Sequence, residues 1–145
     1  MTRIRTVRTP EGTRLEVSHV LAAPPDEIWD LFNDTTRWPE WSPVVNGVES
    51  TDRRVRAGTS GRLRVPGAWL PFTVTERSDR RWTWRVAGTQ GAGHRVDDLG
   101  ADRCRVAFEL PPLAAGCAPV YLEALERIDA IWNDENRGED DGSGP

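Results

Sequence analysis

The sequence predicts an α+β fold in which one long antiparallel sheet packs against a C-terminal helix. Three observations support this prediction. A strand-like pattern at residues 14–21 is followed at once by a helical pattern. Strand-like segments separated by turn residues then fill residues 44–110, and an apolar stripe at helical spacing covers residues 120–132. Runs of strands kept apart from helices are typical of α+β proteins.

The first two elements are predicted by a change in the spacing of apolar residues, from strand-like alternation to helical spacing. The segment "RLEVSHVL" alternates, which predicts a half-buried strand whose inner face carries Leu15, Val17, His19 and Leu21. The next segment, "APPDEIWDLFND", has helical spacing, and its two prolines and two acidic residues suit the first turn of a helix. Thr35 or Thr36 could cap a second helix, which is very short because Pro39 disfavours helical geometry at Trp38 and limits how far the helix runs.

The long middle of the chain predicts about six further strands. They are "VVNGVES", "TSGRLRV", "WLPFTVTE", "RRWTWRVAG", "GHRVDDLG" and "RCRVAFEL". Apolar residues alternate along them with polar ones such as Arg62, Thr83 and Glu109. We expect the polar side to face water, as in a sheet solvated on one side.

The segment "VYLEALERIDAIW" predicts one long terminal helix, because its apolar residues form a stripe that includes Tyr121, Leu125, Ile128 and Trp132. Residues 1–13 are basic and lack periodicity, so we expect a flexible N-terminus. Residues 133–145 are acidic and glycine-rich, so we expect a disordered tail. The folded domain is predicted to span residues 14–132.

The composition argues against several classes of function. The 145 residues fit one domain, and every basic residue is arginine, with a formal net charge of -4. This balance does not favour nucleic acid as a partner. No apolar run is long enough for a signal peptide or a membrane span, and the two cysteines lack CxxC spacing. We therefore expect a cytoplasmic monomer or homodimer.

Motifs for cofactor chemistry are missing from the sequence. The two histidines have no HxxxH or HExxH spacing, and no nucleophile elbow or phosphate loop is present. We expect neither a metal nor another cofactor.

The order of elements, together with "APPDEIWDLFND", "WPEW", "PFTVTE", "WTWRV" and "YLEALERIDAI", resembles the START-like (SRPBCC) helix-grip superfamily, and in particular its polyketide cyclase/dehydrase-like branch. The resemblance covers residues 14–132. It implies a curved sheet of about seven strands wrapped around the C-terminal helix, with two short helices after the first strand. It also implies a cavity between sheet and helix for a lipophilic or aromatic small molecule.

Three tryptophans near the first two helices, Trp29, Trp38 and Trp41, favour a structural interpretation. Large aromatic residues at helical spacing are more often part of a core than of a binding site. We expect these rings to close one end of the sheet.

Candidate site residues lie at inward positions of the strands and on the terminal helix. Such a cavity is expected to hold roughly 300–1,000 Å³. His94 is the catalytic candidate, because a neutral imidazole can accept a proton; the alternative is a hydrogen-bonded core histidine. His19 favours a structural role, and Tyr121 either donates to a ligand carbonyl or reaches water. The predicted ligand-binding residues are Phe72, Trp82, Trp84, His94, Phe108, Tyr121 and His19.

Three functions fit this fold. The first is binding of a small hydrophobic molecule, with cofactor-free cyclase or dehydratase chemistry by general acid and base. The second is a carrier or sensor without chemistry. The third is a chaperone-type interaction module with a filled core.

Overall fold

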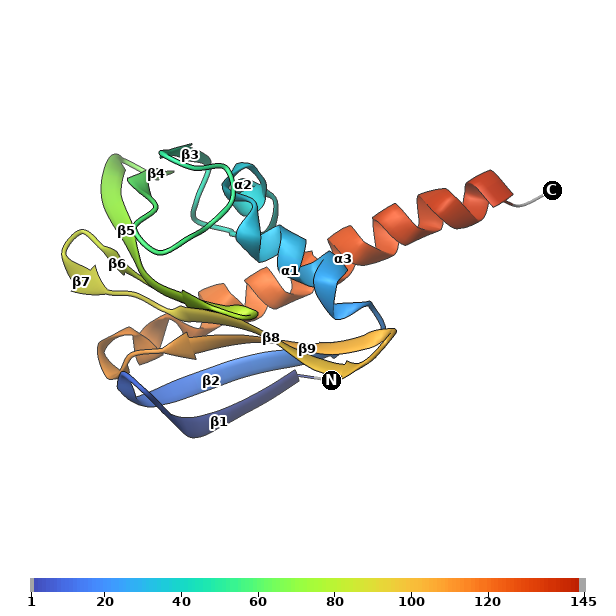
Figure 1. Ribbon diagram of the computed structural model, residues 1–145, viewed down its shortest axis with the longest axis horizontal. Coiled ribbons are helices and arrows are strands. Elements are labelled where there is room, and N and C mark those ends of the chain that lie inside the picture. The colour runs from blue at the N-terminus through green and yellow to red at the C-terminus, as the bar shows by residue number, and fades with distance from the viewer. Residues whose placement is uncertain (1, 144–145) are drawn as a thin grey trace.

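The computed structural model describes residues 2–143 and places a single curved sheet against three α-helices (Figure 1). The elements in chain order are β1 (Thr2–Thr9), β2 (Gly12–Leu21), α1 (Pro25–Asn33), the 3-10 turn η1 (Thr35–Arg37), α2 (Trp38–Trp41), β3 (Gly47–Ser50), β4 (Ser60–Val65), β5 (Ala68–Ser78), β6 (Arg81–Val86), β7 (Thr89–Gln90), β8 (Gly93–Gly100), β9 (Arg103–Leu110), the 3-10 turn η2 (Pro112–Cys117) and α3 (Ala118–Ser143).

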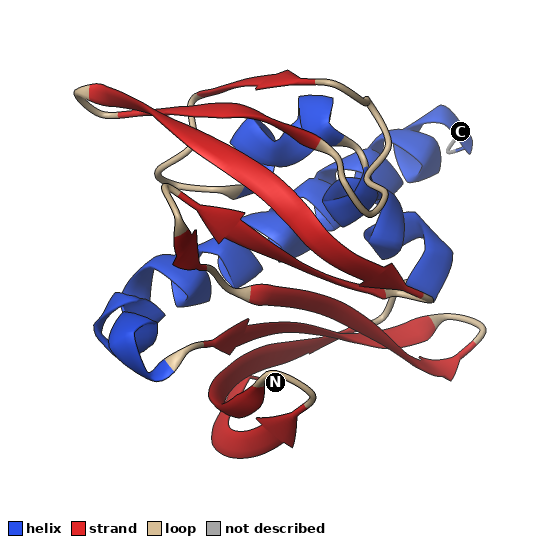
Figure 2. Cartoon of the chain, turned by 60° about the vertical axis from the view of Figure 1, so that its left-hand side comes forward, coloured by secondary structure: helices blue, strands red, loops and turns tan. Residues whose placement is uncertain are grey.

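The predicted α+β helix-grip arrangement is confirmed. The strands pair in the order β1-β2-β9-β8-β6-β5-β4-β3, every pair is antiparallel, and β7 adds to β6. All three helices lie on one face of the sheet (Figure 2). The strand pattern placed the inner face correctly, because the inward residues Phe72, Val74, Val96, Val106 and Phe108 are all buried.

The N-terminal segment differs from the expected flexible N-terminus. Residues 2–9 form β1, which pairs along its whole length with β2, from Thr2 opposite His19 to Thr9 opposite Gly12. Its two apolar residues, Ile4 and Val7, lie on opposite faces of the strand, so hydrophobic periodicity did not reveal it. With β1 and the two-residue β7, the described sheet has nine strands where about seven were expected.

The C-terminal helix also continues beyond the expected end of the domain at residue 132. α3 extends to Ser143, across most of the segment that was predicted to be a disordered tail. The last two residues of that segment, 144–145, lie outside the described part of the chain. Half-buried Arg37 and exposed Glu135 form an ion pair at 2.6 Å, which links η1 to this part of α3.

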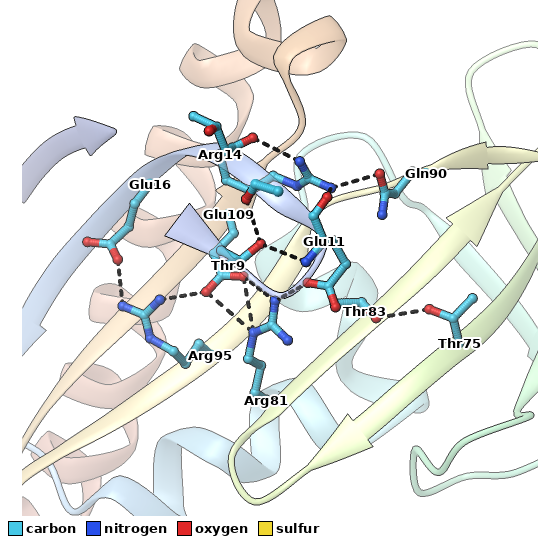
Figure 3. Close-up of polar contacts among 12 residues, drawn as sticks. Thr9, Glu11, Arg14, Glu16, Thr75, Arg81, Thr83, Gln90, Arg95 and Glu109 are labelled. Carbon is cyan, nitrogen blue, oxygen red and sulfur yellow. Dashed lines mark hydrogen bonds and ion pairs between the residues drawn. The ribbon is translucent and has the colours of Figure 1, made fainter. Parts of the chain in front are cut away.

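The convex face of the sheet carries a set of ionised side chains that we call the convex ion cluster: Glu11, Glu16, Arg81, Arg95 and Glu109 (Figure 3). Arg95 bonds both Glu16 and Glu109 at 2.6 Å, and Arg81 bonds Glu109 at 2.7 Å. Glu16 and Glu109 are buried, which corrects the expectation of a fully solvated polar face. Long arginine side chains from neighbouring strands cover these carboxylates and neutralise their charge.

Candidate functional site

An apolar cavity of about 210 Å³ lies between the inner face of the sheet, the connector after α2, and α3. Its inner wall is buried and its rim includes exposed Val44. The volume is smaller than expected, because bulky core rings such as Phe32, Phe72 and Phe108 fill much of the concave face. The lining residues are Trp38, Trp41, Ser42, Pro43, Val44, Val45, Leu63, Val65, Leu70, Trp84, Val86, Gly91, His94, Val120, Tyr121 and Ala124.

Trp38 and Trp41 form one wall of the cavity and also fix α2 to α1. The Trp38 indole Nε1 donates to the Phe32 carbonyl oxygen at 2.9 Å, and Trp41 Nε1 donates to that of Leu31 at 2.9 Å. These bonds satisfy both indoles where they are buried. The two rings are therefore structural, as expected, and lie at the cavity as well.

The connector that follows α2 is held at its first residue, Ser42. Ser42 Oγ accepts a hydrogen bond from the Val45 backbone N–H at 3.1 Å, which closes the turn. Arg127 of α3 donates to the Ser42 carbonyl oxygen at 3.2 Å. The connector, which forms part of the cavity lining, is thus tied to α3.

His94 lies on β8 in the wall opposite α3 and is almost completely buried. Its ring stacks on Trp82 with centroids 3.7 Å apart and planes 13° apart. Burial lowers the pKa of His94 from its ordinary 6.5 to about 3; the Trp82 backbone opposes this shift and the charge of Arg81 adds to it. The imidazole is therefore neutral at pH 7, which suits a hydrogen-bonding role better than acceptance of a proton.

Tyr121, on the first turns of α3, lies across the cavity and packs against Phe108 with ring centroids 5.0 Å apart. Burial raises the pKa of its phenol to about 12, and the neighbouring Cys117 contributes in the same direction. Its hydroxyl keeps its proton at neutral pH and remains available as a donor.

Trp84 and His94 each carry a polar atom without a hydrogen-bond partner in the described part of the chain. These atoms are Trp84 Nε1 and His94 Nδ1, and both are buried. A Cβ on Gly91 would lie 2.5 Å from Trp84 Nε1, which is too close for a side chain, so only glycine fits against the indole N–H without displacing it. Buried polar groups are seldom left unpaired, which makes this corner of the cavity unusual.

The structure brings together three of the predicted ligand-binding residues, Trp84, His94 and Tyr121. Phe72, Trp82 and Phe108 lie outside the lining and belong to the surrounding core, where Trp82 supports His94. They have the predicted inward orientation, but neighbouring rings cover them.

His19 also lies outside the cavity. Its Nδ1 is 3.0 Å from Thr2 Oγ1, and its Nε2 is 3.5 Å from an Asp129 carboxylate oxygen. This position joins β1, β2 and α3 and agrees with the structural role that the sequence favoured for His19.

Sequence reasoning missed the contribution of the connector and of the two α2 tryptophans to the lining. The spacing of Trp38 and Trp41 was visible, but it indicated packing and gave no sign of the cavity beside them. Residues 42–45 have no periodicity, and their place at the cavity follows only from the fold.

Other types of site were also considered. Among residues 2–136, whose side chains are described, no group of three or more His, Cys, Asp or Glu residues is placed to hold a metal ion. Within residues 2–143, no helix has the length and apolar character required to cross a membrane.

Comparison with solved structures shows the same fold at low sequence identity. The protein XoxI from Bacillus cereus aligns with a TM-score of 0.67 and 15% identity, over 85% of this chain and 97% of that one. A START superfamily protein from Mycobacterium smegmatis aligns with a TM-score of 0.61 and 18% identity, over 81% of this chain and 95% of that one. Norcoclaurine synthase from Thalictrum flavum, in complex with dopamine and hydroxybenzaldehyde, aligns with a TM-score of 0.55 and 15% identity. The alignment covers 92% of this chain and 88% of that one.

Comparison with curated proteins finds no match. The family described as polyketide cyclase / dehydrase and lipid transport matches residues 12–128, which include all elements from β2 to η2 and the first part of α3. The START-like resemblance noted in the sequence is thereby confirmed, and the chain belongs to the polyketide cyclase/dehydrase and lipid transport family.

Proposed function

We propose that the protein binds one small, mostly apolar molecule in the cavity between its sheet and α3 and acts as a carrier or sensor. The observation that supports this most is the cavity itself, about 210 Å³ in volume and walled by Trp38, Trp41 and Trp84. An apolar protein cavity of roughly 150 Å³ is large enough to hold benzene. A molecule with one ring and a short substituent therefore fits this site.

Cyclase or dehydratase chemistry is the second candidate, because His94 and Tyr121 line the same cavity. Norcoclaurine synthase, which shares the fold, is an enzyme with aromatic ligands. However, a general acid or base works best with a pKa near the working pH, whereas the pKa is about 3 for His94 and about 12 for Tyr121. These values favour binding without chemistry.

Calorimetric titration with ethylbenzene tests the proposal. We expect saturable binding to the native protein, and loss of binding in Ala124→Leu, because Ala124 is a buried part of the lining on α3. The matched control is Ala130→Leu, the same change at an exposed position of the same helix, which leaves binding intact. Absence of binding to the native protein, or equal binding to Ala124→Leu, contradicts the proposal.

A second experiment separates the carrier from the enzyme. Any ligand that copurifies, detected by native mass spectrometry, is incubated with fresh protein and recovered. A carrier returns it unchanged in mass and chromatographic retention, whereas loss of water or a new retention time indicates catalysis.

A further inference from the structure

The polar atoms of the cavity wall restrict the chemistry of its ligand. Trp84 is about nine-tenths buried, and its Nε1, which can only donate, has no partner among the described residues. His94 is 1% exposed, and its Nδ1 is likewise unpaired. A buried donor left without an acceptor carries the cost of its lost hydration, so a ligand that supplies an acceptor gains affinity.

Charge restricts the ligand further. The lining, within residues 2–136, contains no Asp, Glu, Arg or Lys. An ion placed there leaves water without gaining a counter-charge, which is costly in an apolar environment. The neutral His94 supplies no compensating positive charge at pH 7.

On these two observations, and resting on the proposed binding function, we infer that the cavity selects an uncharged single-ring aromatic molecule whose substituent carries an oxygen acceptor, such as a carbonyl or a phenolic hydroxyl. The ring packs among Trp38, Trp41 and Tyr121, and the oxygen accepts from Trp84 Nε1 beside Gly91. His94 is the second polar group of the lining, and as a neutral imidazole it can donate or accept a hydrogen bond.

Three probes of similar shape test this inference by titration: acetophenone, α-methylstyrene and benzoate. The first carries a carbonyl, the second replaces it with an apolar CH₂ group, and the third is an anion at pH 7. The ratio of affinities for acetophenone and α-methylstyrene is compared between the native protein and Trp84→Phe, which keeps a ring but lacks the indole N–H. Comparing ratios cancels the different water solubilities of the two probes.

We expect Trp84→Phe to reduce the acetophenone preference about 3- to 10-fold, the change that loss of one hydrogen bond produces. The matched control is Trp69→Phe, which removes an indole N–H at an exposed position outside the cavity and leaves the ratio unchanged. Gly91→Ala places a Cβ 2.5 Å from Trp84 Nε1, which displaces the indole N–H, and should also reduce the ratio. Benzoate is expected to bind at least about 10-fold more weakly than acetophenone.

The outcomes separate this inference from the proposed function. If both neutral probes bind but their ratio is the same in Trp84→Phe, the oxygen contact is wrong while the binding function stands. If benzoate binds as tightly as acetophenone, selection of neutral ligands is wrong. If none of the three probes binds, the proposed function itself is contradicted.

Discussion

His94 lies at the centre of the aromatic core, between Trp82, which it stacks on, and Phe32 and Phe108, which meet it edge-on. Its pKa is lowered because protonation would place a charge among these rings. The unfolded chain takes up a proton below pH 6.5, while the folded protein does so only near pH 3. The stability that this group contributes is therefore complete above pH 6.5 and is lost as the pH falls towards 3.

This difference predicts a pH slope in stability. Between pH 7 and pH 5, the free energy of unfolding is expected to fall by about 2 kcal/mol on account of His94. Urea denaturation at pH 7, 6 and 5 measures the slope. We expect it to disappear in His94→Phe and to persist in His19→Gln, the matched control at the other histidine, which lies outside the cavity. A slope that survives in His94→Phe would falsify this account.

At the scale of elements, β1 depends on the convex ion cluster beneath it. Arg3 and Arg5 of β1 both bond Glu16 Oε1 of β2, at 3.1 and 3.0 Å, and Arg95 of β8 bonds Oε2. Burial alone would raise the pKa of Glu16, but the hydrogen bonds from Arg95, Arg5 and Arg3 outweigh it and lower the pKa from 4.5 to about 2. The charged form of this carboxylate therefore contributes stability above pH 4.5 that is lost as the pH falls towards 2.

Glu16→Gln is expected to lower the free energy of unfolding by about 3 kcal/mol at pH 7, because it leaves part of the charge on Arg95 without a partner. The loss should shrink at pH 2.5, where the native Glu16 gains a proton more readily. Chemical denaturation at the two pH values measures it. Glu49→Gln is the control, since its pair with Arg62 is exposed and its removal should change little. Equal effects of the two substitutions would show that burial of the cluster is unimportant.

The far end of α3 is expected to contribute little to the free energy of unfolding, because its ion pair lies at the surface. Deleting residues 134–145 removes the exposed Arg37–Glu135 ion pair, and such pairs contribute below about 1 kcal/mol. We expect thermal denaturation of the shortened chain within a few degrees of the full protein. A chain that ends at residue 131 also loses Trp132, whose Nε1 donates to the Ala22 carbonyl oxygen at 3.2 Å, and should be clearly less stable. A large loss from the first deletion would show that the tail is docked.

At the scale of the whole molecule, the fold was predictable in those segments where the spacing of apolar residues alone shows which side is buried. Alternation along β4, β5, β6, β8 and β9 and the apolar stripe on α3 indicate which side of each element is buried. β1 escaped prediction because Arg3 and Arg5, which bond Glu16 of the neighbouring β2, stay partly exposed, and no apolar alternation marks such a strand. Likewise, inward orientation was correct for Phe72 and Trp84 alike, but only Trp84 lines the cavity. Which inward rings border a space depends on how all the others pack, and sequence patterns do not record that.

The indole N–H signals of the protein's tryptophans provide the most direct test of the binding site. In a ¹H–¹⁵N correlation spectrum titrated with acetophenone, we predict saturable shifts for Trp38, Trp41 and Trp84, which line the cavity. The signals of Trp29 and Trp132, which lie outside it, are predicted to stay in place. Saturable shifts confined to Trp29 and Trp132, or no shift in any indole signal, would contradict a ligand site between the sheet and α3.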